Sequence, residues 1–81
     1  MIKKTKVLIT GAAGFVGFHL SKSLLKNNFD VVAIDNLNDY YSVSLKKTRL
    51  EILLQHSAIF FKIDITNLEE LKQCFIKEEP D

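Results

Sequence analysis

The sequence predicts an α/β fold in which parallel strands alternate with helices. Three short, β-rich apolar segments occur along the 81 residues, and a longer segment with helical spacing follows each of them. Strands separated by helices of this length pair in parallel through right-handed crossovers, which place helices on both faces of the sheet. The predicted order of elements is therefore β-α-β-α-β-α.

The first strand is expected at residues 6–10, where a nearly continuous apolar run indicates burial on both faces. The helix after it should span residues 15–27 and end at Asn27-Asn28. Its i, i+4, i+8 positions predict the buried stripe Val16, Leu20 and Leu24.

The second strand is expected at residues 30–35 and the third at residues 58–64, and both end in an aspartate. Between them we expect a helix from about 44 to 55, with the apolar stripe Leu50, Leu53 and Leu54. The last helix should cover residues 67–77. Thr66 and Glu69 match a capping box with the threonine as N-cap. The residues expected on the buried face of this helix are Leu68, Leu71, Phe75 and, in a packing role, Cys74.

The composition excludes several classes of function. Eleven Lys+Arg against ten Asp+Glu give a net charge of +1, so nothing points to nucleic acid or an anionic membrane. No apolar stretch approaches the ~18 residues that span a bilayer, and the run after the charged N-terminus is too short for a signal peptide. The one cysteine forms no internal disulfide, and no Cys/His spacing fits a metal. A cytoplasmic protein that handles a small molecule is expected.

The most specific signal is the spacing of Gly11, Gly14 and Gly17 between an expected strand and an expected helix. Gly11 permits the turn, Gly14 lets the backbone approach a pyrophosphate, and Gly17 lets the helix pack closely against the strand. The helix N-terminus then offers N–H groups to the phosphates. A P-loop is excluded, because Phe18-His19 follows the last glycine instead of Lys-Ser/Thr.

Asp35 follows at the end of the next strand, about 20 residues past the glycines, where a carboxylate accepts the ribose 2′-hydroxyl. Its charge repels a 2′-phosphate and so favours NAD over NADP. Asp64, at the end of the third strand, either contacts the cofactor or caps the turn into the next helix. Together these features predict a Rossmann-type parallel sheet of which only the first half is present.

Residues 10–20 resemble the extended short-chain dehydrogenase/reductases, whose glycine motif is Thr-Gly-x-x-Gly-x-x-Gly. Residues 34–41, together with 43–46 and 49–50, narrow the resemblance to the NAD-dependent UDP-glucuronate 4-epimerases. The resemblance implies that NAD takes a hydride from C4 of a UDP-sugar and returns it to the opposite face. The catalytic Tyr-x-x-x-Lys of that family is absent here, because neither Tyr40 nor Tyr41 has a lysine four positions on.

The resemblance implies cofactor contacts from each part of the motif. The pyrophosphate contacts would be Gly11, Gly14, Phe15, Val16 and Gly17. The adenosine contacts would be Asp35 and Asn36 at the ribose, Asp64 and Ile65 near the adenine, and Asn38 and Lys46 as further contacts. From its position alone, Lys46 fits a solvated helix face with Lys47 better than a phosphate clamp. His19 is expected to have a structural role, and His56 is expected to be exposed to solvent. Tyr40 and Tyr41 either close over the adenosine or pack the loop onto the sheet.

Two interpretations remain open. The chain is either the NAD-binding start of a nucleotide-sugar epimerase or related dehydratase, or a non-catalytic dinucleotide-binding module. In the first case the UDP-sugar binds only in a full-length, homodimeric parent, and residues 1–81 alone are inactive. The first strand would normally pair with a fourth, so its open apolar edge is expected to favour association.

Overall fold

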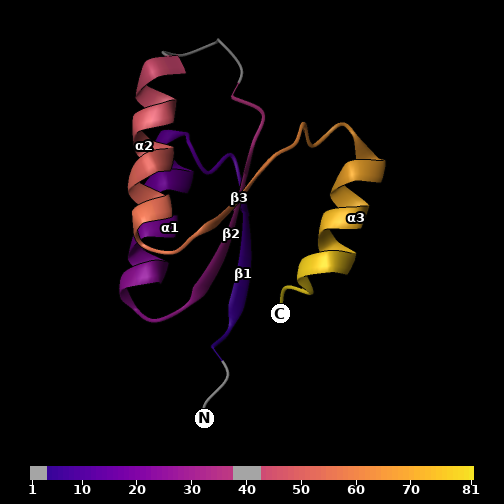
Figure 1. Ribbon diagram of the computed structural model, residues 1–81, viewed down its shortest axis with the longest axis horizontal. Coiled ribbons are helices and arrows are strands. Elements are labelled where there is room, and N and C mark those ends of the chain that lie inside the picture. The colour runs from indigo at the N-terminus through magenta and orange to yellow at the C-terminus, as the bar shows by residue number, and fades with distance from the viewer. Residues whose placement is uncertain (1–3, 38–42) are drawn as a thin grey trace.

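The computed structural model describes residues 4–37 and 43–81. They form a three-stranded parallel sheet in the order β1-β2-β3 (Figure 1). The elements are β1 (Lys6–Thr10), α1 (Phe15–Lys26), β2 (Asp30–Asp35), α2 (Val43–Gln55), β3 (Ile59–Lys62) and α3 (Leu68–Glu78). Helices α1 and α2 cover one face and α3 covers the other, which confirms the predicted Rossmann-type half.

The central strand β2 is buried from its second residue to its last. Val31 and Ala33 belong to the apolar cluster on the α1 and α2 side. Val32 and Ile34 belong to the cluster on the α3 side. Because both faces are covered, the strand is apolar at every position between its two terminal aspartates, Asp30 and Asp35, rather than at alternate positions.

Strand β3 is shorter than the predicted span of 58–64. Lys62, its last residue, pairs with Asp35, the last residue of β2. The ladder therefore ends where the partner strand ends. Asp64 lies beyond the strand, in the turn toward α3, and not at the strand end as predicted.

The predicted stripe of α1 is wrong at two of its three positions, since Val16 is 75% exposed and Leu20 is 47% exposed. Gly17 determines which face turns inward, because a Cβ there would overlap the carbonyl of Gly11. At this point the helix lies so close to the glycine loop that only glycine fits. The inner face consists of Gly17, Phe18, Ser21, Leu24 and Leu25.

Ser21 on this face is fully buried, and its Oγ has no hydrogen-bond partner in the described part of the chain. Replacing Ser21 with alanine should raise the free energy of unfolding by about 1–2 kcal/mol, because the desolvation cost of the hydroxyl disappears. Urea unfolding followed by circular dichroism measures this. Ser23→Ala, at an exposed position of the same helix, controls for helix propensity. A Ser21→Ala chain no more stable than Ser23→Ala would contradict the prediction.

Helix α2 buries two of its three predicted apolar residues, Leu50 and Leu53, while Leu54 is exposed. Helix α3 departs further from its prediction, because Leu68 and Phe75 are exposed. The residues of α3 that turn toward the sheet are Leu71, Cys74 and Glu78.

Cys74 has the expected packing role, since it is buried and contributes to the cluster on the α3 face. Burial raises the pKa of its thiol, and the nearby charge of Glu78 adds to this rise. The thiol is therefore held in its protonated, unreactive form at neutral pH.

The cap of α3 lies one residue later than predicted. Asn67 is the N-cap, and its Oδ1 accepts the N–H of Glu70 at 3.2 Å. Its Nδ2 in turn donates to the carboxylate of Glu70 at 2.9 Å. Thr66 does not cap the helix, because its hydroxyl donates to Asp64.

Strand β1 lies at the edge of the sheet, as expected. Its first residue, Lys6, is hydrogen-bonded to Asp81. The backbone N–H of Asp81 donates to the Lys6 carbonyl at 2.8 Å, and the N–H of Lys6 donates to the Asp81 carboxylate at 2.6 Å. The Lys6 ammonium also donates to the carbonyl of Glu78. Association through the rest of this edge stays a prediction. None of the described helices is long and apolar enough to cross a membrane.

Candidate functional site

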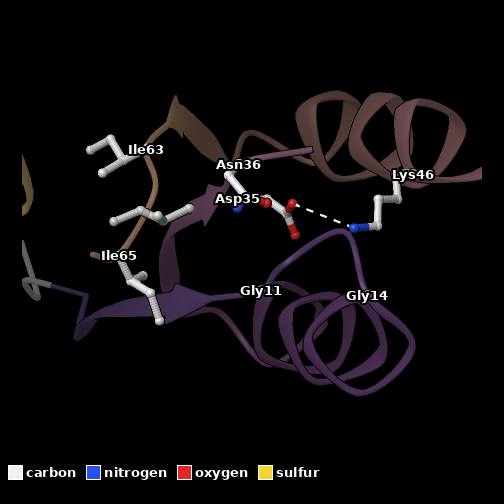
Figure 2. A pocket seen from close by; sticks show the side chains of 8 residues that line it. Gly11, Gly14, Asp35, Asn36, Lys46, Ile63 and Ile65 are labelled. Atoms are coloured by element: carbon white, nitrogen blue, oxygen red, sulfur yellow. Dashed lines mark ion pairs between the residues drawn. The ribbon is translucent and has the colours of Figure 1, made fainter. Parts of the chain in front are cut away.

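A cavity of about 250 Å³ opens at the carboxyl ends of the strands, where open α/β sheets bind their ligands (Figure 2). Its volume falls below the roughly 300–1,000 Å³ of pockets that enclose a whole drug-sized ligand. It therefore suits one part of a dinucleotide. The lining residues are Gly11, Gly14, Ile34, Asp35, Asn36, Lys46, Ile63 and Ile65.

Most of the site residues predicted from the sequence gather at this cavity. Phe15, Val16 and Gly17 follow the lining glycines in the first turn of α1. Asp64 does not line the cavity, and Asn38 lies outside the described residues. The sequence analysis missed Ile34 and Ile63, although each directly precedes an aspartate that it singled out.

The three glycines meet different steric demands. Gly11 has φ +66°, a left-handed conformation in which other residues are strained. A Cβ on Gly14 would lie 3.3 Å from the Gly11 carbonyl oxygen, a tight but adjustable contact. A Cβ on Gly17 would lie 2.2 Å from the same oxygen, which is backbone and cannot move aside. The close approach predicted for Gly17 is thus present, but its neighbours are Gly11 and Ala12 of the loop and not the strand, as had been predicted.

Three N–H groups of the glycine loop are used within the fold. The N–H of Ala12 donates to the Ile34 carbonyl at 3.1 Å, and that of Gly14 to the Gly11 carbonyl at 3.0 Å. The N–H of Ala13 donates to Asp35 Oδ2 at 3.0 Å. These bonds fasten the loop to the end of β2 and leave the N–H groups of α1 as the donors available to a ligand.

The N-terminus of α1 is built without a cap of its own. Gly14 is the N-cap residue and has no side chain to accept a hydrogen bond, and no acidic residue lies in the first turn. By helix geometry the N–H groups of Phe15, Val16 and Gly17 have no intrahelical acceptor. Three such donors at the positive end of a helix dipole form an anion site that fits a pyrophosphate.

Asp35 has a second role that sequence reasoning missed. It is 6% exposed, and besides Ala13 it accepts the N–H of Leu37 on Oδ1 at 2.7 Å. Each carboxylate oxygen has two lone pairs, so the group can anchor the loop and still accept from a ribose hydroxyl. The only sequence signal for the anchor is that an aspartate follows a strand adjacent to the loop.

Lys46 contradicts the expectation of a solvated face, because it is only 6% exposed, whereas Lys47 is exposed. Lys46 lies one turn before Leu50, on the buried side of α2, where its aliphatic stem can pack. Its Nζ lies 4.0 Å from Asp35 Oδ1 (Figure 2). The ammonium and the carboxylate form one buried pair at the rim of the cavity.

Asp64 caps the turn before α3, the structural alternative considered for it. Its Oδ1 accepts the Thr66 hydroxyl at 2.7 Å and the Thr66 N–H at 2.9 Å. Ile65, the next residue, is half exposed and its side chain points toward the cavity (Figure 2). Ile65, rather than Asp64, is therefore the residue of this turn that can face a ligand.

The Thr66 hydroxyl and then the Thr66 N–H lower the pKa of Asp64, with a smaller contribution from the Asn36 side chain. A carboxylate with a lowered pKa stabilises the fold above its unfolded pKa, and this contribution is lost as the pH falls through the folded pKa. Thr66→Val removes the first cause and should raise the pKa of Asp64 in an NMR titration. Thr48→Val, whose hydroxyl bonds the Ser44 carbonyl, should leave it unchanged. Equal pKa values in both variants would refute the assignment.

His19 has the structural role expected for it, whereas Tyr40 and Tyr41 lie outside the described residues. The His19 ring packs edge-on against Phe15 at 4.7 Å and Phe18 at 5.1 Å between centroids, and His56 is exposed as predicted. Over the described ranges, no three His, Cys, Asp or Glu side chains come together as metal ligands.

Comparisons with known proteins agree with this geometry. UDP-glucuronate 4-epimerase 2 of Arabidopsis thaliana is 49% identical over 70 residues, which are 85% of this chain and 16% of that protein. UDP-glucuronate 4-epimerase of Thermodesulfobacterium geofontis is 46% identical over 69 residues, 84% of this chain and 21% of that protein. Protein CapI of Staphylococcus aureus is 45% identical over 94% of this chain and 23% of its own length.

Among solved structures, UDP-glucose 4-epimerase of Thermotoga maritima, crystallised with UDP-glucose, superposes with a TM-score of 0.71 at 28% identity. The match covers 94% of this chain and 22% of that one, so the chain spans about a fifth of these proteins. Residues 7–81 match the sequence profile of the NAD dependent epimerase/dehydratase family. This match includes the glycine loop, Asp35 and all three helices, and the chain belongs to the NAD-dependent epimerase/dehydratase family.

Proposed function

We propose that these residues are the N-terminal part of an NAD-binding domain and hold the adenosine and pyrophosphate of NAD. One observation carries the proposal: the N–H groups of Ala12, Ala13 and Gly14 have acceptors within the fold, while the first N–H groups of α1 remain available beside a buried carboxylate. That arrangement offers an anion site and a ribose acceptor at the same cavity.

The assignment of residues follows their positions. The N–H groups of Phe15, Val16 and Gly17 bind the pyrophosphate, and the glycines let it approach. The residues assigned to the adenosine ribose are Asp35, Asn36 and Lys46, together with Asn38, which lies outside the described residues. The adenine lies against the apolar side chains of Ile63 and Ile65, and Asp64 acts by shaping the turn between them and α3.

The substrate of the whole protein is proposed from its relatives. Several are named UDP-glucuronate 4-epimerases, which favours inversion at C4 of a UDP-sugar. In that reaction NAD supplies a reversible hydride acceptor. A cytoplasmic location and a homodimeric parent belong to the same proposal and do not follow from these names. The 81 residues contain no Tyr-x-x-x-Lys, so we expect no turnover from them alone. A non-catalytic module or a different sugar dehydratase or epimerase remains the alternative.

Calorimetric titration of the 81-residue chain with NAD tests the proposal. We expect saturable binding that Gly14→Val removes, because the added side chain presses on the Gly11 carbonyl and fills the approach to the pyrophosphate. Asp30→Asn, at the exposed start of β2, should bind like the parent chain. A chain that is folded by circular dichroism and binds no NAD would refute the proposed function. Epimerisation of UDP-glucuronate by the chain alone would refute the expected inactivity.

A further inference from the structure

Arg49 on α2 contacts the glycine loop. Its Nη1 donates a hydrogen bond to the Ala13 carbonyl oxygen at 3.2 Å. Its guanidinium carbon also lies 6.0 Å from the ring centroid of Phe15 and 5.8 Å from that of Phe18. A planar cation is attracted to aromatic faces, so α1 and the loop together orient this side chain.

Ala13 is thereby held from both sides. Its N–H donates to the Asp35 carboxylate on β2, while its carbonyl accepts from Arg49 on α2. Ala13 is buried and directly precedes Gly14, the N-cap of α1. The two peptide groups that flank Ala13 at the entry to the helix are therefore both fixed, the one before it by an anion and the one after it by a cation.

We propose that Arg49 is a positioning residue for the pyrophosphate. By holding the Ala13 carbonyl, it fixes the direction in which the first N–H groups of α1 point. This inference rests on the proposed function, in which those groups bind NAD. Since Asp35 holds the other end of Ala13 and lines the ribose side of the cavity, one loop residue connects the ribose and pyrophosphate subsites.

NMR titrations with ADP and with adenosine separate positioning from general stability, because only ADP carries a pyrophosphate. Arg49→Met should weaken ADP binding about tenfold, the effect of losing one hydrogen bond of ordinary strength. Adenosine binding should change less than about twofold. Lys47→Met, which removes the same charge from an exposed position of α2, should affect neither ligand. Parallel weakening of both ligands by Arg49→Met would mean a merely structural role and would overturn the proposal.

Arg49→Lys tests whether charge alone is sufficient. An ammonium has no plane to lie over the two rings, so ADP should bind several-fold more weakly than to the parent chain. Parental ADP affinity in this variant would overturn the proposal.

Hydrogen exchange in the ligand-free chain gives a second readout. The N–H groups of Gly14 and Phe18 donate to the Gly11 and Gly14 carbonyls. Both should exchange faster in Arg49→Met and not in Lys47→Met, and unchanged exchange in Arg49→Met would overturn the proposal. This result does not depend on ligand binding, so a parent chain that fails to bind ADP would refute the proposed function separately.

Discussion

Replacing Gly17 with alanine is expected to lower the free energy of unfolding by about 3 kcal/mol, the upper end of the usual cost of overpacking. The added Cβ would lie 2.2 Å from the Gly11 carbonyl oxygen and 2.8 Å from its carbon. Backbone cannot rotate away as a side chain can, so either α1 or the loop must shift. Each shift separates the α1 N–H groups from the end of β2, and we expect NAD binding to be lost.

Thermal unfolding and calorimetry measure this effect against two matched substitutions. In a chain of this size, 3 kcal/mol corresponds to a fall in Tm of about 12–24 °C. Gly14→Ala, with its nearest contact at 3.3 Å, should cost much less. Gly11→Ala should lower the free energy of unfolding by an intermediate amount, about 1–2 kcal/mol, because the backbone of Gly11 is left-handed but its surroundings are open. A Gly17→Ala chain that melts and binds NAD like Gly14→Ala would contradict the packing described here.

Asp35→Asn is expected to weaken NAD binding by about 100-fold, since hydrogen bonds to a charged group contribute about 1.5–3 kcal/mol. The same change disrupts the pair with Lys46, whose side chains are 5% and 7% exposed. Breaking such a buried pair costs about 3–5 kcal/mol. We expect the free energy of unfolding to fall by about 3 kcal/mol, the lower end of this range. The asparagine oxygen can still accept one of the two N–H groups, those of Ala13 and Leu37, that Asp35 accepts.

Asp35→Asn should also change the preference between NAD and NADP, an effect that a loss of stability alone cannot produce. Removing the carboxylate removes its repulsion of a 2′-phosphate, while the charge of Lys46 remains at the cavity. The ratio of the NADP to the NAD dissociation constant should therefore fall by about tenfold or more. Asp30→Asn, at the exposed end of the same strand, should preserve stability and preference. An unchanged ratio in Asp35→Asn would show that this carboxylate does not face the ribose.

Local patterns predicted the elements and the glycines and acid of the cavity, and the resemblance to the epimerases added Asn36, Lys46 and Ile65. Continuous apolar runs identified the strands, and the glycine spacing together with a following aspartate identified the loop and its acid. These signals are local, because a turn, a strand or a helix start depends on residues a few positions apart. The local signals were least accurate in predicting which face of a helix is buried. In α1 the inner positions include Gly17 and Ser21, which a search for apolar side chains passes over.

The alternation of strands and helices, the glycine turn and the acid that follows it can all be read from the order of residues along the chain. The burial of Lys46, the hydrogen bond from Thr66 to Asp64 and the residues that hold the loop depend on the folded arrangement. The bonds to Ala13 come from Asp35 and Arg49, 22 and 36 positions away. Contacts over such separations leave no periodic trace in the sequence, because they arise only when the sheet brings distant segments together.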